Sequence, residues 1–291
     1  MECRVIDSTK DSIFSELIKN GHNEYLPKTA GELEALLRRK IYRTKTYLDG
    51  NNLKGADGVK YMRFNNINSL GASVGNCFEE LVGRLKRIPT QKEYVDLGTE
   101  LTASWWINAQ LNRDYRIKGL SFDGVIVEAC RERMARSYLS IINEIHTHLL
   151  LKELYPTAKI ITHNVIDLVL GVDIIMELDN RRYYIHILKD SKFSIDSYYS
   201  KENHGGLFKD GNYYKYKRDF TGDILLTYTT KDSVKCITLR DIPLFRREYL
   251  KEYIDNTISN ANYGECMDKR GKLDQLNDFI FNLFKIQLDF A

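Results

Sequence analysis

Several features that would place a protein in a class at once are missing from this chain of 291 residues. No apolar run approaches the roughly 18 residues of a membrane-spanning helix, and the first residues lack the basic-then-apolar pattern of a secretory signal. The five cysteines form no CxxC pair, which favours reduced thiols over a structural zinc site. P-loop, GxGxxG, GxSxG and HExxH patterns are absent as well. We therefore expect a cytoplasmic protein with no membrane segment.

The charge balance is close to even. The chain has 43 lysines and arginines and 40 acidic residues, a net charge of +3, which is compatible with a local basic patch but does not prove a polyanionic partner. Apolar residues make up 43% and charged residues 29%, as in ordinary globular proteins. The length suits one large domain or two ordinary ones.

The first third of the chain is predicted to be helical. Apolar spacing predicts helices over Ser12–Lys19, Thr29–Tyr47 and about Gly71–Arg87, and the glycines and asparagines of residues 50–58 predict a loop. In the second helix Thr29 is a candidate N-cap, and the expected buried stripe consists of Leu33, Leu36, Leu37 and Ile41.

A helix pair is predicted next. Thr90 can cap a short helix that Gly98 ends, and Glu100–Leu111 can form the following helix. This spacing suits a helix-turn-helix whose second helix reads DNA through Ser104, Trp105, Trp106 and Asn108. The alternative is an ordinary helical hairpin with buried tryptophans.

The rest of the chain alternates helices and strands. Helices are predicted over Arg131–Tyr155, Arg247–Ile258 and Lys272–Lys285, and strands over Val125–Val127, Ala158–His163, two strands within Gly171–Asp190, Asp223–Tyr228 and Lys235–Thr238. This order indicates an α/β fold. We expect a helical N-terminal region over residues 1–115, for DNA recognition or dimerisation, and an α/β core with C-terminal helices over residues 116–291.

The segment Gly171–Asp190 contains a candidate site. Asp173 lies in an apolar run, where a charge is costly unless it has a partner or a function, and Lys189 closes a second apolar run. A turn at Asp179–Asn180 would bring both to the same open end of a hairpin. A carboxylate and a lysine there can hold Mg²⁺ and act on a phosphodiester. Glu144, 29 residues before Asp173 and beside the apolar stripe of the long helix, is a candidate second acid. The alternative for Asp173 is a partner on a neighbouring strand, and for Lys189 a solvated strand end.

A helix with an acid, a strand, an Asp-bearing strand and a lysine-ended strand together resemble the core of the PD-(D/E)XK nuclease superfamily, over about residues 131–228. The resemblance implies a restriction-endonuclease-like mixed central sheet flanked by helices. It also implies catalysis by Asp173, Glu144 and Lys189, with Mg²⁺ held by the two acids. Ile187 departs from the pattern, because Glu or Asp normally stands two positions before the lysine. Either Glu144 supports catalysis, or the fold has lost its activity.

A basic, tyrosine-rich segment follows the hairpin. Basic side chains can contact phosphates and aromatic rings can stack on bases, so we expect nucleic-acid contacts from Lys192, Lys201, Lys209, Tyr214, Lys215, Lys217 and Arg218. The alternative is an exposed hairpin with alternating tyrosines. The predicted function is a Mg²⁺-dependent endonuclease of double-stranded DNA, of the type II restriction endonuclease kind, acting as a homodimer and accompanied by a DNA methyltransferase encoded nearby. The alternative is a non-catalytic nucleic-acid-binding protein with the same fold.

Overall fold

The computed structural model describes residues 25–47, 50–65, 67, 74–162, 171–204 and 220–266. These residues belong to two compact units. The sheet unit contains the described residues from 150 to 229 and from 247 to 266, and the helix unit contains those from 25 to 149 and from 230 to 246. Among them, no helix combines the length and apolar character needed to cross a bilayer. The fold is mixed α/β, as predicted.

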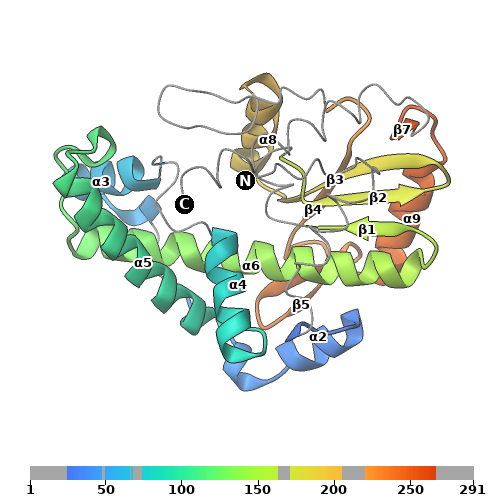
Figure 1. The fold of residues 1–291 in the computed structure, drawn as a ribbon, viewed down its shortest axis with the longest axis horizontal. Coiled ribbons are helices and arrows are strands. Elements are labelled where there is room, and N and C mark those ends of the chain that lie inside the picture. Colours follow the sequence, from blue (N-terminus) through green and yellow to red (C-terminus); the bar gives the residue numbers. More distant parts are fainter. Residues whose placement is uncertain are drawn as a thin grey trace, which may run out of the picture. The chain divides into compact units, whose positions relative to one another are not determined.

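The sheet unit is built on a mixed sheet of four main strands (Figure 1). β1 (Lys159–Ile161), β2 (Ile174–Leu178) and β3 (Arg181–Lys189) are antiparallel neighbours, and β4 (Ile224–Tyr228) pairs parallel to β3. A parallel pair needs a crossover connection, and here it includes α8 (Lys192–His204). The short β7 (Glu265–Cys266) pairs with the start of β3. Helix α9 (Arg247–Ile258) begins and ends at the predicted residues.

The β2–β3 hairpin turns where the sequence predicts it. Asp179 and Asn180 have φ of 50° and 59°, the left-handed values that a two-residue type I′ turn requires at both positions. The register pairs Leu178 with Arg181 and Ile174 with Ile185. The middle of one face of the sheet is consequently apolar, and its residues are at most 4% exposed: Ile174, Met176, Tyr183, Ile185, Ile187, Ile224 and Leu226. This face is the core of the unit.

The long helix begins earlier than predicted. α6 runs from Gly124 to Leu154, so the strand predicted at Val125–Val127 is wrong. The Asp123 Oδ1 accepts hydrogen bonds from the N–H groups of Val125 and Ile126. This cap begins the helix at Gly124, before the first residue of its apolar stripe. Of the apolar stripe predicted along this helix, Met134, Tyr138, Ile142 and Leu149 are buried, whereas Ile141 and Ile145 are only half-buried.

The helix unit contains α2 (Ala30–Leu37), α3 (Gly55–Asn65), α4 (Val74–Leu85), α5 (Gln91–Leu111) and the hairpin of β5 (Cys236–Leu239) and β6 (Ile242–Phe245). The loop predicted over residues 50–58 holds a 3-10 turn and the start of α3, with Gly55 at φ 61° at its first position. The predicted helices Ser12–Lys19 and Lys272–Lys285 lie outside the described residues.

The predicted helix pair is one helix. Thr90 is its N-cap and forms a capping box with Glu93, as the sequence indicates, but α5 continues through Gly98 without a break. Gly98 is buried because the side chain of Met134 packs against its Cα. The helix-turn-helix prediction is therefore wrong. Trp106 is 1% exposed and packs against Phe64 and Phe122, whereas Trp105 is half-buried, so the alternative of a hairpin with buried tryptophans is met only at Trp106.

Helix α2 ends ten residues before the predicted end. Thr29 caps it as predicted, with its hydroxyl accepting the Glu32 N–H, and Leu33 and Leu37 are fully buried. After Leu37 the chain forms a 3-10 turn over Lys40–Tyr42 and then an extended stretch. Tyr42 takes the buried place and Ile41 is 62% exposed, so the predicted burial of Ile41 is wrong.

Candidate active site at the open end of the hairpin

Asp173 lies against the backbone of β3. Its N–H donates to the Ile185 carbonyl at 3.1 Å, and its Oδ2 accepts the Ile187 N–H at 2.5 Å. The last backbone pair of the hairpin is Ile174 with Ile185, so the carboxylate continues the pairing where β2 has ended. Thr162 Oγ1 donates to the Asp173 carbonyl at 3.1 Å. A charge-assisted bond to the strand fixes the half-buried carboxylate.

Lys189 stands at the same end of the hairpin, on the other face of the sheet. Opposed residues of an antiparallel pair share a face, so Ile174, Ile185, Ile187 and Lys189 lie on one side. Asp173, one position before Ile174, follows the opposite side. Lys189 is exposed and pairs with Tyr228 of β4. A site that uses both groups has to form around the strand ends, where the two faces meet.

Ile187 occupies the position where the nuclease pattern places a second acid. Its side chain is 4% exposed and belongs to the apolar face of the sheet. Only its backbone N–H takes part in the site, through the bond to Asp173. An aliphatic side chain cannot bind a cation. Ile187 instead packs in the apolar face of the sheet and positions Asp173 through its N–H.

Glu144 lies on α6, half-buried, in the part of that helix that belongs to the helix unit. The neighbouring Asn143 and His146 are fully buried. Among the residues that the structure describes, no group of three or more His, Cys, Asp or Glu side chains could hold a metal ion. Mg²⁺ keeps several waters and binds through one or two carboxylates, so a carboxylate such as that of Asp173 has suitable chemistry. The assignment of Asp173 and Glu144 as ligands stays a prediction.

A second polar cluster, which the sequence analysis did not identify, is buried on the Asp173 side of the sheet. His186 is 2% exposed, and its Nε2 lies 2.6 Å from Asp223 Oδ2, just before β4. The rings of Tyr198 from α8 and Phe220 pack on the imidazole, each with its centroid 4.8 Å away. His186 is thus a packed, hydrogen-bonded core residue. Asp223, the first residue of the strand predicted over Asp223–Tyr228, was the available signal for its partner.

The same face contains an ion pair across the hairpin. Arg182 is 4% exposed and its Nε donates to Glu177 Oε1 at 2.9 Å, directly opposite on β2. Lys159 of β1, also opposite Glu177, lies 3.8 Å from the other carboxylate oxygen. Each of these charged side chains therefore has a partner of opposite charge within the sheet unit.

Most of the residues predicted to contact phosphates lie outside the described residues. Lys192 is exposed at the first position of α8, and Lys201 lies further along the same helix. Lys209, Tyr214, Lys215, Lys217 and Arg218 lie outside the described residues.

No protein-family model, curated protein or solved structure matches the chain. Its function therefore has to be argued from its own residues.

Proposed function

We propose that the chain is a Mg²⁺-dependent endonuclease that cleaves double-stranded DNA, of the type II restriction endonuclease kind. The carrying observation is the Asp173 carboxylate bound to β3 at Ile187, two residues before Lys189. The mixed sheet supports the proposal, since helix α6 with Glu144, β1, β2 with Asp173 directly before it, and the lysine-ended β3 follow one another in the expected order. In this proposal the protein works in the cytoplasm as a homodimer, with a DNA methyltransferase encoded nearby.

Each residue has a defined task in this proposal. Asp173 and Glu144 would hold Mg²⁺, with the Leu188 carbonyl as a further ligand, and the ion would supply Lewis-acid chemistry at the phosphate. Lys189 orients the attacking water and stabilises negative charge on the phosphate oxygens, because its exposed ammonium ends β3. Ile187 keeps the Asp173 carboxylate in position through its N–H.

A non-catalytic nucleic-acid-binding protein is the second candidate. Ile187 favours it, because this buried side chain removes the second acid that the nuclease pattern normally provides. In that case Asp173 would serve only to hold the chain before β2 against β3.

The deciding experiment is cleavage of plasmid and phage DNA with Mg²⁺ and with chelator. We expect cleavage only with Mg²⁺, and losses of about a thousandfold or more, several kcal/mol in the barrier, in Asp173→Asn and Lys189→Ala. Asparagine keeps an acceptor oxygen for the Ile187 N–H, so the hairpin should stay intact. Asp196→Asn and Lys152→Ala, which remove exposed charges of the same unit, are the matched controls. DNA binding without cleavage would favour the second candidate, and full activity in Asp173→Asn would remove the proposed site.

A further inference from the structure

A short cationic segment, residues 38–45, crosses the surface of the helix unit. Its sequence, RRKIYRTK, contains five cations and no acid, and all five are exposed: Arg38, Arg39, Lys40, Arg43 and Lys45. Arg38 lies 3.9 Å from Glu34, its ion-pair partner. In the part of the chain that the structure describes, the other four form no salt bridge.

The backbone of this segment is held at several points. Tyr42 is 1% exposed, and its hydroxyl donates to the Ile88 carbonyl at 3.1 Å. The Lys45 N–H donates to Gln91 Oε1 at 2.6 Å, and Gln91 is itself buried. Folding has therefore already ordered the backbone between the cations, so binding a ligand loses little further backbone entropy.

The turn between β5 and β6 holds the other side of the segment. Thr44 Oγ1 donates to the Arg240 carbonyl at 3.1 Å and to Asp241 Oδ2 at 3.3 Å, while Arg240 Nη2 donates to the Arg38 carbonyl at 2.8 Å. Arg240 thereby adds a sixth exposed cation beside the segment. We call residues 38–45 with Arg240 the cationic ridge.

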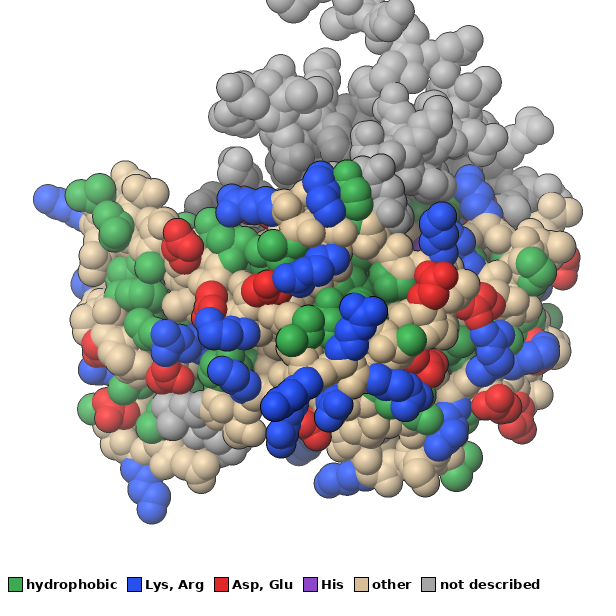
Figure 2. Space-filling model, turned by 90° about the horizontal axis from the view of Figure 1, so that it is seen from below, with side chains coloured by type: hydrophobic (Ala, Val, Ile, Leu, Met, Phe, Trp, Pro, Cys, Tyr) green, Lys and Arg blue, Asp and Glu red, His purple; other side chains and the backbone are tan. Residues whose placement is uncertain are grey.

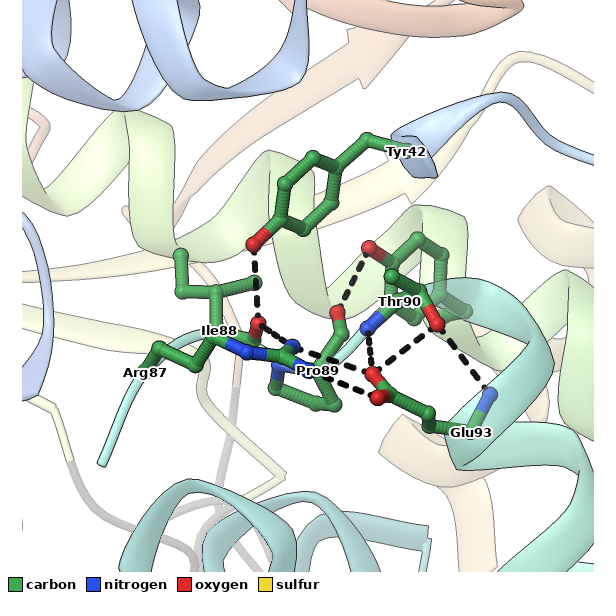
Figure 3. A network of polar contacts seen from close by, with 7 residues as sticks. Tyr42, Arg87, Ile88, Pro89, Thr90 and Glu93 are labelled. Atoms are coloured by element: carbon green, nitrogen blue, oxygen red, sulfur yellow. Dashed lines mark hydrogen bonds and ion pairs between the residues drawn. The ribbon is translucent and has the colours of Figure 1, made fainter. Parts of the chain in front are cut away.

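A polar network supports the ridge from below (Figure 3). Arg87 bridges the Ile88 carbonyl, which also accepts the Tyr42 hydroxyl, to the carboxylate of Glu93, which closes the capping box with Thr90. Tyr138 of α6 donates to the Pro89 carbonyl at 2.9 Å. Through Glu93 and Tyr138, this network connects the ridge to the two long helices α5 and α6.

The helix unit as a whole also carries an excess of positive charge. Its described residues include 23 lysines and arginines and 15 acidic residues, an excess of eight positive charges. Figure 2 shows one face of the molecule, with lysine and arginine side chains spread over it and acidic side chains among them. A locally uncompensated positive surface attracts polyanions.

We propose that the cationic ridge binds the phosphate backbone of double-stranded DNA. The choice of DNA rests on the proposed function, and the ridge adds the surface that holds this substrate. Phosphate contacts position a duplex without reading its sequence. An anionic membrane fits the ridge less well, because membrane-surface helices insert a continuous apolar face and Ile41 is the one exposed large hydrophobic residue within the segment.

Salt-dependent DNA binding, measured with chelator so that no cleavage occurs, tests the ridge. The test variant combines Arg39→Ala, Lys40→Ala, Arg43→Ala and Lys45→Ala. The matched control combines Arg84→Ala, Lys92→Ala, Arg131→Ala and Arg136→Ala, which remove the same charge from cations of the same unit that already have carboxylate partners. Fluorescence anisotropy of a labelled duplex between about 50 and 200 mM salt gives the slope of log K against log[salt].

We expect the slope to fall by about 3 to 4 in the test variant, since each phosphate contact contributes about 0.9, and affinity at about 100 mM salt to fall at least tenfold. The control should change the slope by less than about 1. Equal losses in both variants would overturn the proposal, because net charge alone would then explain binding. Ridge-dependent binding to anionic vesicles without binding to DNA would overturn it as well.

Acetylation of the wild-type chain provides a readout that needs no variant. DNA should protect Lys40 and Lys45 from the reagent more than Lys92, and equal protection would contradict the ridge. The cleavage assay separates this proposal from the proposed function. Cleavage by a chain whose ridge variant binds DNA like wild type would refute the ridge alone, whereas ridge-dependent binding without cleavage would refute the nuclease alone.

Discussion

The two units use charge in different ways. The described residues of the sheet unit contain nine cations and twelve acidic residues, and its buried polar side chains face each other in the pairs Arg182–Glu177 and His186–Asp223. The helix unit has 23 cations against 15 acids and displays the cationic ridge on its surface. Buried pairs serve the fold, because removing one partner leaves a desolvated charge. Unpaired surface cations cost the fold little and remain available to a ligand. In the proposed nuclease, Asp173 and Lys189 belong to the sheet unit, whereas Glu144 and the DNA-binding ridge belong to the helix unit.

The largest stability effect is expected from breaking a buried pair of the sheet unit. Asp223→Ala leaves His186, 2% exposed, without the carboxylate at 2.6 Å. Removing one member of a buried pair costs about 3–5 kcal/mol, so we expect a loss of about 3 kcal/mol in the free energy of unfolding. Urea denaturation, followed by circular dichroism, measures it.

Asp196→Ala is the control, because this acid is exposed on α8 of the same unit. Its effect should stay within about 0.5 kcal/mol. If Asp223→Ala were as mild as the control, the pair would not hold the sheet unit together, and the contrast between the two units would fail.

A smaller effect is expected from the paired charge of the helix unit. Hydrogen bonds from Arg87 and Thr90 lower the pKa of Glu93 to about 2. Glu93→Gln removes this charge, and we expect a loss of about 1–2 kcal/mol at neutral pH, because about a third of the side chain is exposed and solvent screens the pair. Glu100→Gln, an exposed position of the same helix, should change stability by less than about 0.5 kcal/mol.

The pH dependence of this loss has a defined sign. A pKa that is lower in the folded than in the unfolded chain gives stability that is complete above the unfolded value, about 4.3, and is lost as the pH falls toward 2. The difference between wild type and Glu93→Gln should therefore shrink between pH about 4.3 and 2. A constant difference across this range would show that packing, and not charge, makes Glu93 important.

Local signals in the sequence were sufficient for the hairpin. Alternating apolar residues and the Asp-Asn turn gave its strands, and the register then followed from the two-residue turn. The same register shows why Asp173 and Lys189 share an end but not a face, since alternation assigns them to opposite sides. The bond from Ile187 to Asp173 was not predictable, because it depends on where β2 stops pairing.

Tertiary contacts decided what local patterns could not. The apolar spacing continued to Ile41, yet Tyr42 is buried, because its hydroxyl reaches the Ile88 carbonyl 46 positions away. The cations around it stand within the helix predicted over Thr29–Tyr47, whereas the structure places them in a 3-10 turn and an extended stretch after α2. The place of Glu144 relative to Asp173 depends on packing between distant elements, which no local pattern specifies.

The smallest effects are expected from alanine substitutions at two helical glycines, Gly83 and Gly98. They test the packing contact that the structure shows at Gly98, where the sequence predicts the end of a helix. A Cβ at Gly83 in α4 meets nothing within 4 Å, so Gly83→Ala should stabilise the chain by about 0.5–1 kcal/mol through helix propensity. A Cβ at Gly98 would overlap the terminal methyl of Met134 and come within 2.9 Å of its sulfur. Met134 is 4% exposed and has little room to move, so Gly98→Ala should destabilise by about 1 kcal/mol after the gain in propensity. Thermal unfolding of both variants measures the difference. If Gly98→Ala stabilised like Gly83→Ala, Met134 would have to yield freely, and the close packing of α5 on α6 at Gly98 would be refuted.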